Sequence, residues 1–180
     1  MNMESHDYFR ARLSQAVIEL FRDYGVECTS TGGASTGCLA APSEGEVGSM
    51  VGLKGNNFRG GLALVAPAAL VAQMLPVPPV VERADLQLRD WSAEMANQLI
   101  GRLKNKLATR ALDFDVGPAT CFRCTSIRFS FPPDANGVSL SFTTPSAQVR
   151  VYLDCSFIAD LVASDDPTMQ VIAEGDTVLF

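Results

Sequence analysis

The sequence contains almost no histidine. Its 180 residues include a single one, His6, which lies close to the first residue. A catalytic triad needs a histidine held beside its nucleophile, and most zinc sites that use imidazole draw on several such ligands. The scarcity of histidine therefore argues against both kinds of site.

Long hydrophobic runs are missing too, and the positive charges are scattered apart from one group over residues 102–110. The longest apolar candidate, residues 61–75, is interrupted by Pro67 and is shorter than the roughly 20 residues that a membrane-spanning helix needs. The first residues are polar and lead into an amphipathic pattern, unlike the apolar core of a signal peptide. The formal net charge is −6, whereas a protein that binds a nucleic-acid backbone needs a basic surface. We therefore expect a cytoplasmic protein that binds neither membranes nor nucleic acid.

The five cysteines do not form a recognisable disulfide or metal framework. Without an export signal we expect them to be reduced, with Cys155 as a small core residue and Cys28 able to pair with Cys38 only if the loop between them folds back. Cys121 and Cys124 form a C-x-x-C on or just before a strand, where residues three apart point to opposite faces. A redox or zinc site there is the weaker alternative, because zinc needs convergent ligands.

The segment 29–45 is rich in Ser, Thr and Gly, and we expect it to be partly irregular. Within it, residues 32–37 lack the Gly-Lys-Ser/Thr ending of a phosphate-binding loop. The role of this segment stays open.

Periodicity divides the chain into helices and strands. Helical spacing predicts helices over residues 4–24, 67–74, 86 to about 112, and 157–163, with Gly117-Pro118 ending the longest one. Alternation predicts strands over residues 47–54, 61–66, 127–131, 138–142 and 149–155, the first two joined as a hairpin, and residues 76–79 form a proline-rich connector. This order predicts a single α+β domain over residues 1–180, with long helices packed against a largely antiparallel sheet.

The longest helical pattern carries a narrow polar stripe. At about 100° per residue from Trp91, seven apolar residues fall within an arc of roughly 180°: Leu88, Met95, Ala96, Leu99, Ile100, Leu103 and Leu107. A second set falls between roughly 240° and 300°: Asp90, Glu94, Asn97 and Gly101. Glycine disfavours a helix by about 1 kcal/mol relative to alanine, but its missing side chain lets a partner approach the backbone.

Polar residues complicate this wheel. Ser92, Arg102 and Lys106 intrude on the apolar arc. Four cations near the end of the pattern are expected to form a solvated helix end: Arg102, Lys104, Lys106 and Arg110. From periodicity alone, an ordinary solvated helix face is the favoured interpretation of the polar stripe.

Residues 90–97 read Asp-Trp-Ser-Ala-Glu-Met-Ala-Asn and fit the pattern Asp/Ser-x3-Glu-x2-Asn. With the continuation 98–101, they resemble the motif helix of the CheC/CheX/FliY family of chemotaxis phosphatases. The first helix and the strands near residues 51–55 and 60–64 occur in the order expected of a CheX-like domain, so the resemblance covers about residues 5–161. No Glu occurs between Glu94 and Glu174, which leaves one motif, as in CheX-type proteins, which tend to dimerise.

The resemblance implies a partner and an activity in two-component or chemotaxis signalling. The family hydrolyses the aspartyl phosphate of a CheY-like response regulator, whose receiver domain holds Mg²⁺ and a lysine. By resemblance, Asn97 would orient the attacking water, Glu94 would pair with that lysine, and Asp90 and Gly101 would support docking. The chain itself would then need neither metal nor cofactor. Two alternatives stay open: a non-catalytic CheC-like module that docks a receiver domain or a switch protein, and a dimeric scaffold.

Overall fold

The structure, a computed structural model, describes residues 3–31, 45–55, 58–108, 114–127, 129 and 137–157. The helical elements are α1 (Met3–Asp23), α2 (Ala68–Gln73), the 3₁₀ turn η1 (Val81–Arg83) and α3 (Ala84–Leu107). The strands are β1 (Thr29–Ser30), β2 (Glu46–Gly55), β3 (Phe58–Pro67), β4 (Phe114–Val116), β5 (Thr120–Cys124), β6 (Val138–Thr143) and β7 (Gln148–Phe157). None of the helices in these ranges is long and apolar enough to cross a membrane.

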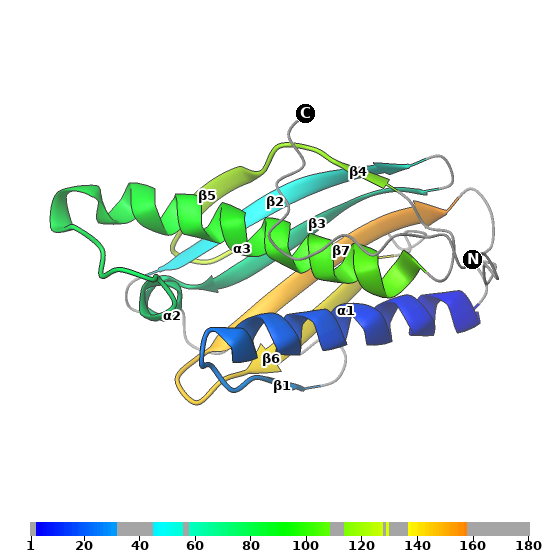
Figure 1. Ribbon diagram of the computed structural model, residues 1–180, viewed down its shortest axis with the longest axis horizontal. Helices are drawn as coiled ribbons and strands as arrows, with labels where there is room; N and C mark the ends of the chain where they lie inside the picture. The colour runs from blue at the N-terminus through cyan, green and yellow to red at the C-terminus, as the bar shows by residue number, and fades with distance from the viewer. Residues whose placement is uncertain are drawn as a thin grey trace.

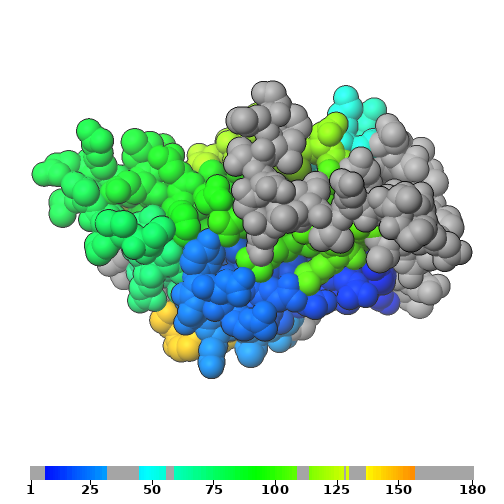
Figure 2. Space-filling model, viewed as in Figure 1, coloured from blue at the N-terminus to red at the C-terminus, as the bar shows by residue number. Residues whose placement is uncertain are grey.

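The strands form one antiparallel sheet in the order β1-β6-β7-β3-β2-β4, and β5 pairs with the other end of β2. The predicted hairpin is confirmed as β2 and β3, paired from Glu46↔Pro67 to Lys54↔Arg59. α1 and α3 lie side by side across one face of the sheet (Figure 1). The connector before α3 and the first turns of that helix form one end of the molecule (Figure 2). The predicted α+β fold with an antiparallel sheet is therefore confirmed.

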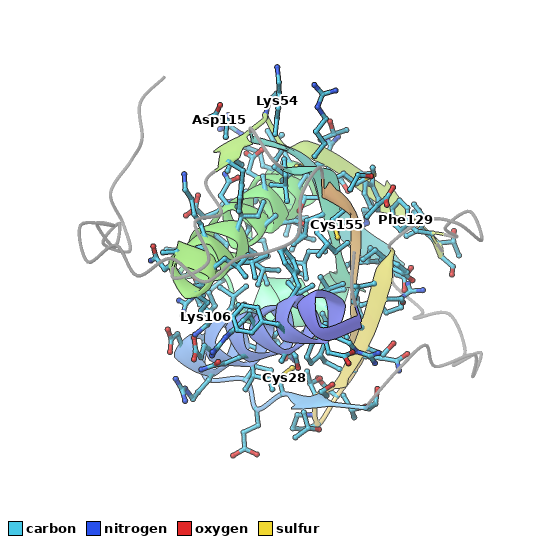
Figure 3. All side chains as sticks on the ribbon, turned by 90° about the vertical axis from the view of Figure 1, so that its right-hand side faces the viewer. Cys28, Lys54, Lys106, Asp115, Phe129 and Cys155 are labelled. Atoms are coloured by element: carbon cyan, nitrogen blue, oxygen red, sulfur yellow. The ribbon has the colours of Figure 1, made fainter. Side chains whose placement is uncertain are left out.

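The core fills the space between the sheet and the helices. All seven residues of the predicted apolar arc of α3 are buried, and α1 contributes a matching row that includes Phe9, Leu13 and Phe21. Cys155 on β7 points into this core, as predicted, and Figure 3 shows it at the sheet, beside the helices. The apolar side of α3 is therefore packed against the core, and this packing fixes the orientation of its opposite side.

The polar residues that intrude on the apolar arc have specific partners. Ser92 is buried, and its backbone oxygen accepts a hydrogen bond of 2.8 Å from Ser49 Oγ on β2. Arg102 pairs with Asp23 at 3.0 Å, and Lys106 pairs with Glu19 at 2.6 Å, which ties α3 to α1.

The expectation of a solvated helix end is wrong for Arg102 and Lys106. Their side chains are only 12% and 18% exposed, because the carboxylates of α1 draw them into the groove between the helices, where Figure 3 shows Lys106. Lys104 donates to the backbone oxygen of Phe114 at 3.1 Å. Arg110 lies outside the described residues.

The opposite face of the sheet carries a small second cluster. Ala63, Val65 and Tyr152 are buried there, and Phe122, Ile127 and Phe129 pack against them. Figure 3 shows Phe129 on the side of the sheet away from the helices. The largely buried ion pair of Arg150 with Glu46 lies on the same face. Arg150 donates a hydrogen bond to the backbone oxygen of Ile127, and the backbone N–H of Ile127 donates to Glu46.

Several predicted boundaries are wrong. α3 ends at Leu107 rather than near residue 112, because the chain reaches β4, where Phe114 is buried opposite Gly55. Of the predicted strand 127–131, Ile127 and Phe129 do not belong to a strand, since the backbone of Ile127 bonds to side chains instead of a neighbouring strand. Residues 128, 130 and 131 lie outside the described residues.

Two further predictions fall wholly or partly outside the described residues. Phe157 belongs to β7, and residues 158–163 of the predicted last helix are not described. Residues 32–44 of the Gly-rich segment, with Cys38, are not described either.

Candidate functional site

The solvent-facing side of α3 brings the four predicted stripe residues together. Asp90, Glu94, Asn97 and Gly101 are all exposed, whereas Met95 and Ala96 between them are fully buried. Spacings of three and four residues place them on consecutive turns of one face. We call this face, residues 90, 94, 97 and 101, the α3 stripe. It presents a carboxylate and an amide one turn apart on a rigid helix.

Glu94 is held by its neighbours on the side that faces α1. The amide nitrogen of Gln98 donates to Glu94 Oε1 at 2.9 Å. The oxygen of the same amide accepts a hydrogen bond of 2.6 Å from the hydroxyl of Tyr24, which follows the last turn of α1. The carboxylate is thus connected to a second helix through two hydrogen bonds.

Gly101 has no structural reason to be glycine. Among the described residues, a Cβ built at this position would meet no atom within 4 Å, apart from the helix's own nearby backbone, which is left out of that measure. The residue lies inside α3, where alanine is the better helix former. A site that leaves the helix backbone open to a docking partner is one use for this residue.

Asp90 lies at the border between α3 and β5. Burial raises the pKa of the Cys121 thiol on β5, and the charge of Asp90 raises it further, while Arg89 lowers it. Ion pairs of Asp85 with Arg89 at 3.1 Å and with Arg123 at 2.9 Å fix β5 against the start of α3. The stripe is therefore bordered by β5 on one side and by α1 on the other.

The C-x-x-C does not have the properties of a reactive pair. Cys121 and Cys124 are free thiols on β5, as the predicted strand placement requires. Burial raises the pKa of the Cys124 thiol, with a further increase from Glu46 against a decrease from Arg150. A higher pKa means less of the thiolate that attacks disulfides or binds metals. In the parts of the chain that the structure describes, no three His, Cys, Asp or Glu residues gather into a metal site.

Three further residues at this surface have no role assigned from the sequence. Leu86 is 52% exposed and precedes Asp90 by one turn, at roughly 220° on the same wheel, so the periodicity could have revealed it. Gln98 could have been found from its spacing of four residues from Glu94. Tyr24 had no such signal, because the packing of α1 on α3 is a tertiary contact 74 residues apart in sequence.

More apolar surface continues from Leu86 into the preceding connector. Val77, Val80 and Val81 are exposed there, and the amide N–H of Val80 donates to Gln87 Oε1 at 2.8 Å. This hydrogen bond holds the connector against the first turn of α3. Figure 2 shows this region at one end of the molecule.

Comparisons with known proteins identify the fold. The sequence matches no protein-family model and no curated protein. Among solved structures, a CheC-like superfamily protein from Shewanella sp. PV-4 has a TM-score of 0.64 at 16% identity, over 87% of this chain and 99% of that one. The chemotaxis protein CheX from Vibrio vulnificus has a TM-score of 0.63 at 17% identity, over 83% and 95% of the two chains.

A further match is the CheX–CheY–BeF3–Mg²⁺ complex from Borrelia burgdorferi. It has a TM-score of 0.63 at 14% identity, over 82% of this chain and 97% of that one. Together these structures show that the chain has a CheC/CheX-like fold.

Proposed function

We propose that the α3 stripe docks the phosphorylated receiver domain of a CheY-like response regulator and promotes hydrolysis of its aspartyl phosphate. The observation that carries the proposal is the joint exposure of Glu94 and Asn97, one turn apart on one face of a well-packed helix. The CheX–CheY complex from Borrelia burgdorferi supports a receiver domain as the partner of this fold. The proposal places the protein in the cytoplasm, where response regulators act.

The reaction requires few chemical groups from the docking protein. A receiver domain supplies its own Mg²⁺ and a lysine, which neutralise charge on the phosphoryl oxygens. Hydrolysis forms a bond from the water oxygen to phosphorus and breaks the bond to the aspartyl oxygen, so inorganic phosphate and a free carboxylate result. Because the water's proton passes to a phosphoryl oxygen or to solvent, no strong base is required. What remains is to hold one water in line with the breaking bond.

Asn97 suits this positioning role. Its amide accepts a hydrogen bond from a water through the oxygen and donates through the nitrogen, and it is neutral at any ordinary pH. Asn97 is exposed on the outer side of α3, so its side chain is free to enter the active site of a docked domain. In this proposal Asn97 is the catalytic residue.

In this proposal Glu94 binds the partner. A carboxylate that meets the lysine of the receiver forms a charge-assisted hydrogen bond and fixes the position of α3 on the partner. Asp90 and the exposed Leu86 extend the contact by one and two turns toward the start of the helix. Gly101 lets the partner lie close to the backbone at the other end of the stripe.

The test is the lifetime of the phosphoryl group on a single-domain receiver that has been phosphorylated with acetyl phosphate in Mg²⁺. We expect the parent protein to shorten this lifetime. Asn97→Ala should lower kcat by roughly 10²-fold, the size of the effect expected when a reacting group is misplaced. Glu94→Ala should act mainly on KM, raising it by about ten- to a hundredfold, since a lost charge-assisted hydrogen bond is worth about 1.5–3 kcal/mol.

Matched controls come from exposed residues outside the stripe. Gln73→Ala removes an exposed amide from α2, and Glu27→Ala removes an exposed carboxylate after α1. Both should keep the parent rate. If Asn97→Ala and Glu94→Ala are as fast as the parent, these roles are wrong.

The alternative is a docking module without catalysis. A protein that binds the phosphorylated receiver and leaves its phosphoryl lifetime unchanged or longer would support that alternative against the phosphatase. Loss of binding in the stripe variants would then identify the stripe as the interface.

A further inference from the structure

Glu94, the residue proposed to bind the partner, is hydrogen-bonded to a neighbouring side chain. Gln98 lies one turn further along α3 and donates from Nε2 to Glu94 Oε1 at 2.9 Å. Only one carboxylate oxygen is engaged by this bond, so the other remains available to a cation on a partner. The half-buried side chain of Gln98 lies on the edge of the stripe that faces α1.

Gln98 is in turn held by Tyr24. The hydroxyl of Tyr24 donates to Gln98 Oε1 at 2.6 Å, and the ring of Tyr24 meets Trp91 edge-on with centroids 5.3 Å apart. These two contacts occupy both ends of the tyrosine side chain. The amide of Gln98 is therefore fixed with its oxygen toward α1 and its nitrogen toward Glu94.

The position of Tyr24 is set by the way α1 ends. Gly25 has φ +73°, Val26 N donates to Phe21 O at 3.0 Å, and Gly25 N donates to Arg22 O at 2.9 Å. This pair of bonds is the Schellman motif, which stops the helix at a defined residue. The ion pair of Asp23 with Arg102 holds the same end of α1 against α3. The end of α1 and its ion pair with α3 thus fix the position of the Tyr24 hydroxyl.

We propose that Tyr24 and Gln98 are positioning residues, which hold the carboxylate of Glu94 in the orientation that a docking partner requires. The hydrogen bonds run in one direction, from the tyrosine hydroxyl through the amide to the carboxylate. Each bond in such a chain polarises the next one. Glu94 consequently has fewer rotamers to lose when a partner binds.

The inference rests on the proposed function for its kinetic test. Tyr24→Phe removes the hydroxyl and keeps the ring against Trp91, and Gln98→Met removes the amide while keeping an unbranched side chain of similar length. With the phosphorylated receiver as substrate, both variants should raise KM about three- to tenfold and leave kcat close to that of the parent. In the Glu94→Ala background neither substitution should have a further effect, since both act through Glu94.

The matched control is Tyr8→Phe. Tyr8 is a second tyrosine of α1, and its hydroxyl contacts α3 at a point remote from the stripe, the backbone oxygen of Lys106, at 3.4 Å. Tyr8→Phe should leave KM unchanged. If it raises KM as much as Tyr24→Phe does, or if Tyr24→Phe raises KM equally without Glu94, the effect is a general loosening of α1 on α3 and the inference is wrong.

A second measurement separates this inference from the proposed function. In the free protein, the NMR signals of the Gln98 side-chain amide should move toward those of a solvated glutamine in Tyr24→Phe and stay unchanged in Tyr8→Phe. Unchanged Gln98 signals in Tyr24→Phe would overturn the inference even if the protein is an active phosphatase. Conversely, a parent protein that does not shorten the phosphoryl lifetime contradicts the proposed function, while these signals still decide whether the three side chains are coupled.

Discussion

At the scale of single residues, a substitution at Gly101 should change folding stability and docking in opposite directions. The space around it is open, so Gly101→Ala should stabilise α3 by about 1 kcal/mol. The same methyl group should obstruct a partner that lies close to the backbone, and KM for the phosphorylated receiver should rise. Thermal or urea unfolding measures the first effect, and the receiver assay measures the second. A variant that is more stable and docks as well as the parent would remove Gly101 from the interface.

The residues of the stripe were accessible to sequence analysis, but their surroundings were not. Helical geometry alone placed Asp90, Glu94 and Asn97 on one face, and all three are exposed. Their chemical role came from the motif resemblance and not from periodicity. The sequence predicts Tyr24 only as the last residue of the first helix, because sequence spacing does not reveal which helix lies beside it.

At the scale of elements, the groove between α1 and α3 contains a pH-dependent contact. Burial opposes the ionisation of Glu19, but hydrogen bonds from Lys106 and Gln15, together with the positive charges of Lys106 and Arg102, lower its pKa below the ordinary value of 4.5. Because the folded-state pKa is the lower one, this stabilisation is present above about pH 4.5 and is lost as the pH falls through the folded value.

Glu19→Gln tests this contact. We expect the variant to be less stable than the parent at pH 7 by about 0.5–1 kcal/mol, since the pair is only partly buried. The difference should shrink as the pH falls below about 4.5. Urea unfolding at several pH values measures it, with Glu27→Gln as the exposed control. A difference that is constant with pH would mean that the ion pair with Lys106 contributes nothing.

The strand β2 contains two glycines on the face away from the helices, Gly48 and Gly52, which differ in the space around them. A Cβ on Gly48 would lie 2.7 Å from Leu64 O and 2.7 Å from the Phe122 ring, whereas a Cβ on Gly52 would meet nothing within 4 Å. Gly48→Ala should therefore destabilise the protein by about 1–3 kcal/mol through overpacking. Gly52→Ala, four residues along the same strand, should have little effect. Equal stability of the two variants would show that the Phe122 ring and the backbone at Leu64 both move aside without penalty.

At the scale of the whole molecule, the order of the main elements was predictable and several boundaries were not. The hairpin of β2 and β3, the strands β6 and β7 and both main helices follow from residue periodicity. β4 and β5 did not, because they are short strands that pair with opposite ends of β2. The loop at Ile127 was misread as a strand, since its apolar residues cover the outer face of the sheet.

The cations of α3 show a similar limit of sequence analysis. Arg102 and Lys106 looked like solvent-exposed charges, yet each has a carboxylate partner on α1. Only the packing of two distant helices shows that these charges join elements together. The same packing delivers Tyr24 to the border of the stripe.

The central claim is that Asn97 positions the water that attacks a phosphorylated receiver docked on α3. The most direct measurement compares Asn97→Ala with the parent on two readouts: affinity for a receiver loaded with BeF3 and Mg²⁺, and the rate of phosphoryl loss at saturating protein. We expect a Kd within about threefold of the parent, because Asn97 contributes little to docking, and a rate lower by roughly 10²-fold. A variant that removes the phosphoryl group as fast as the parent would contradict the account.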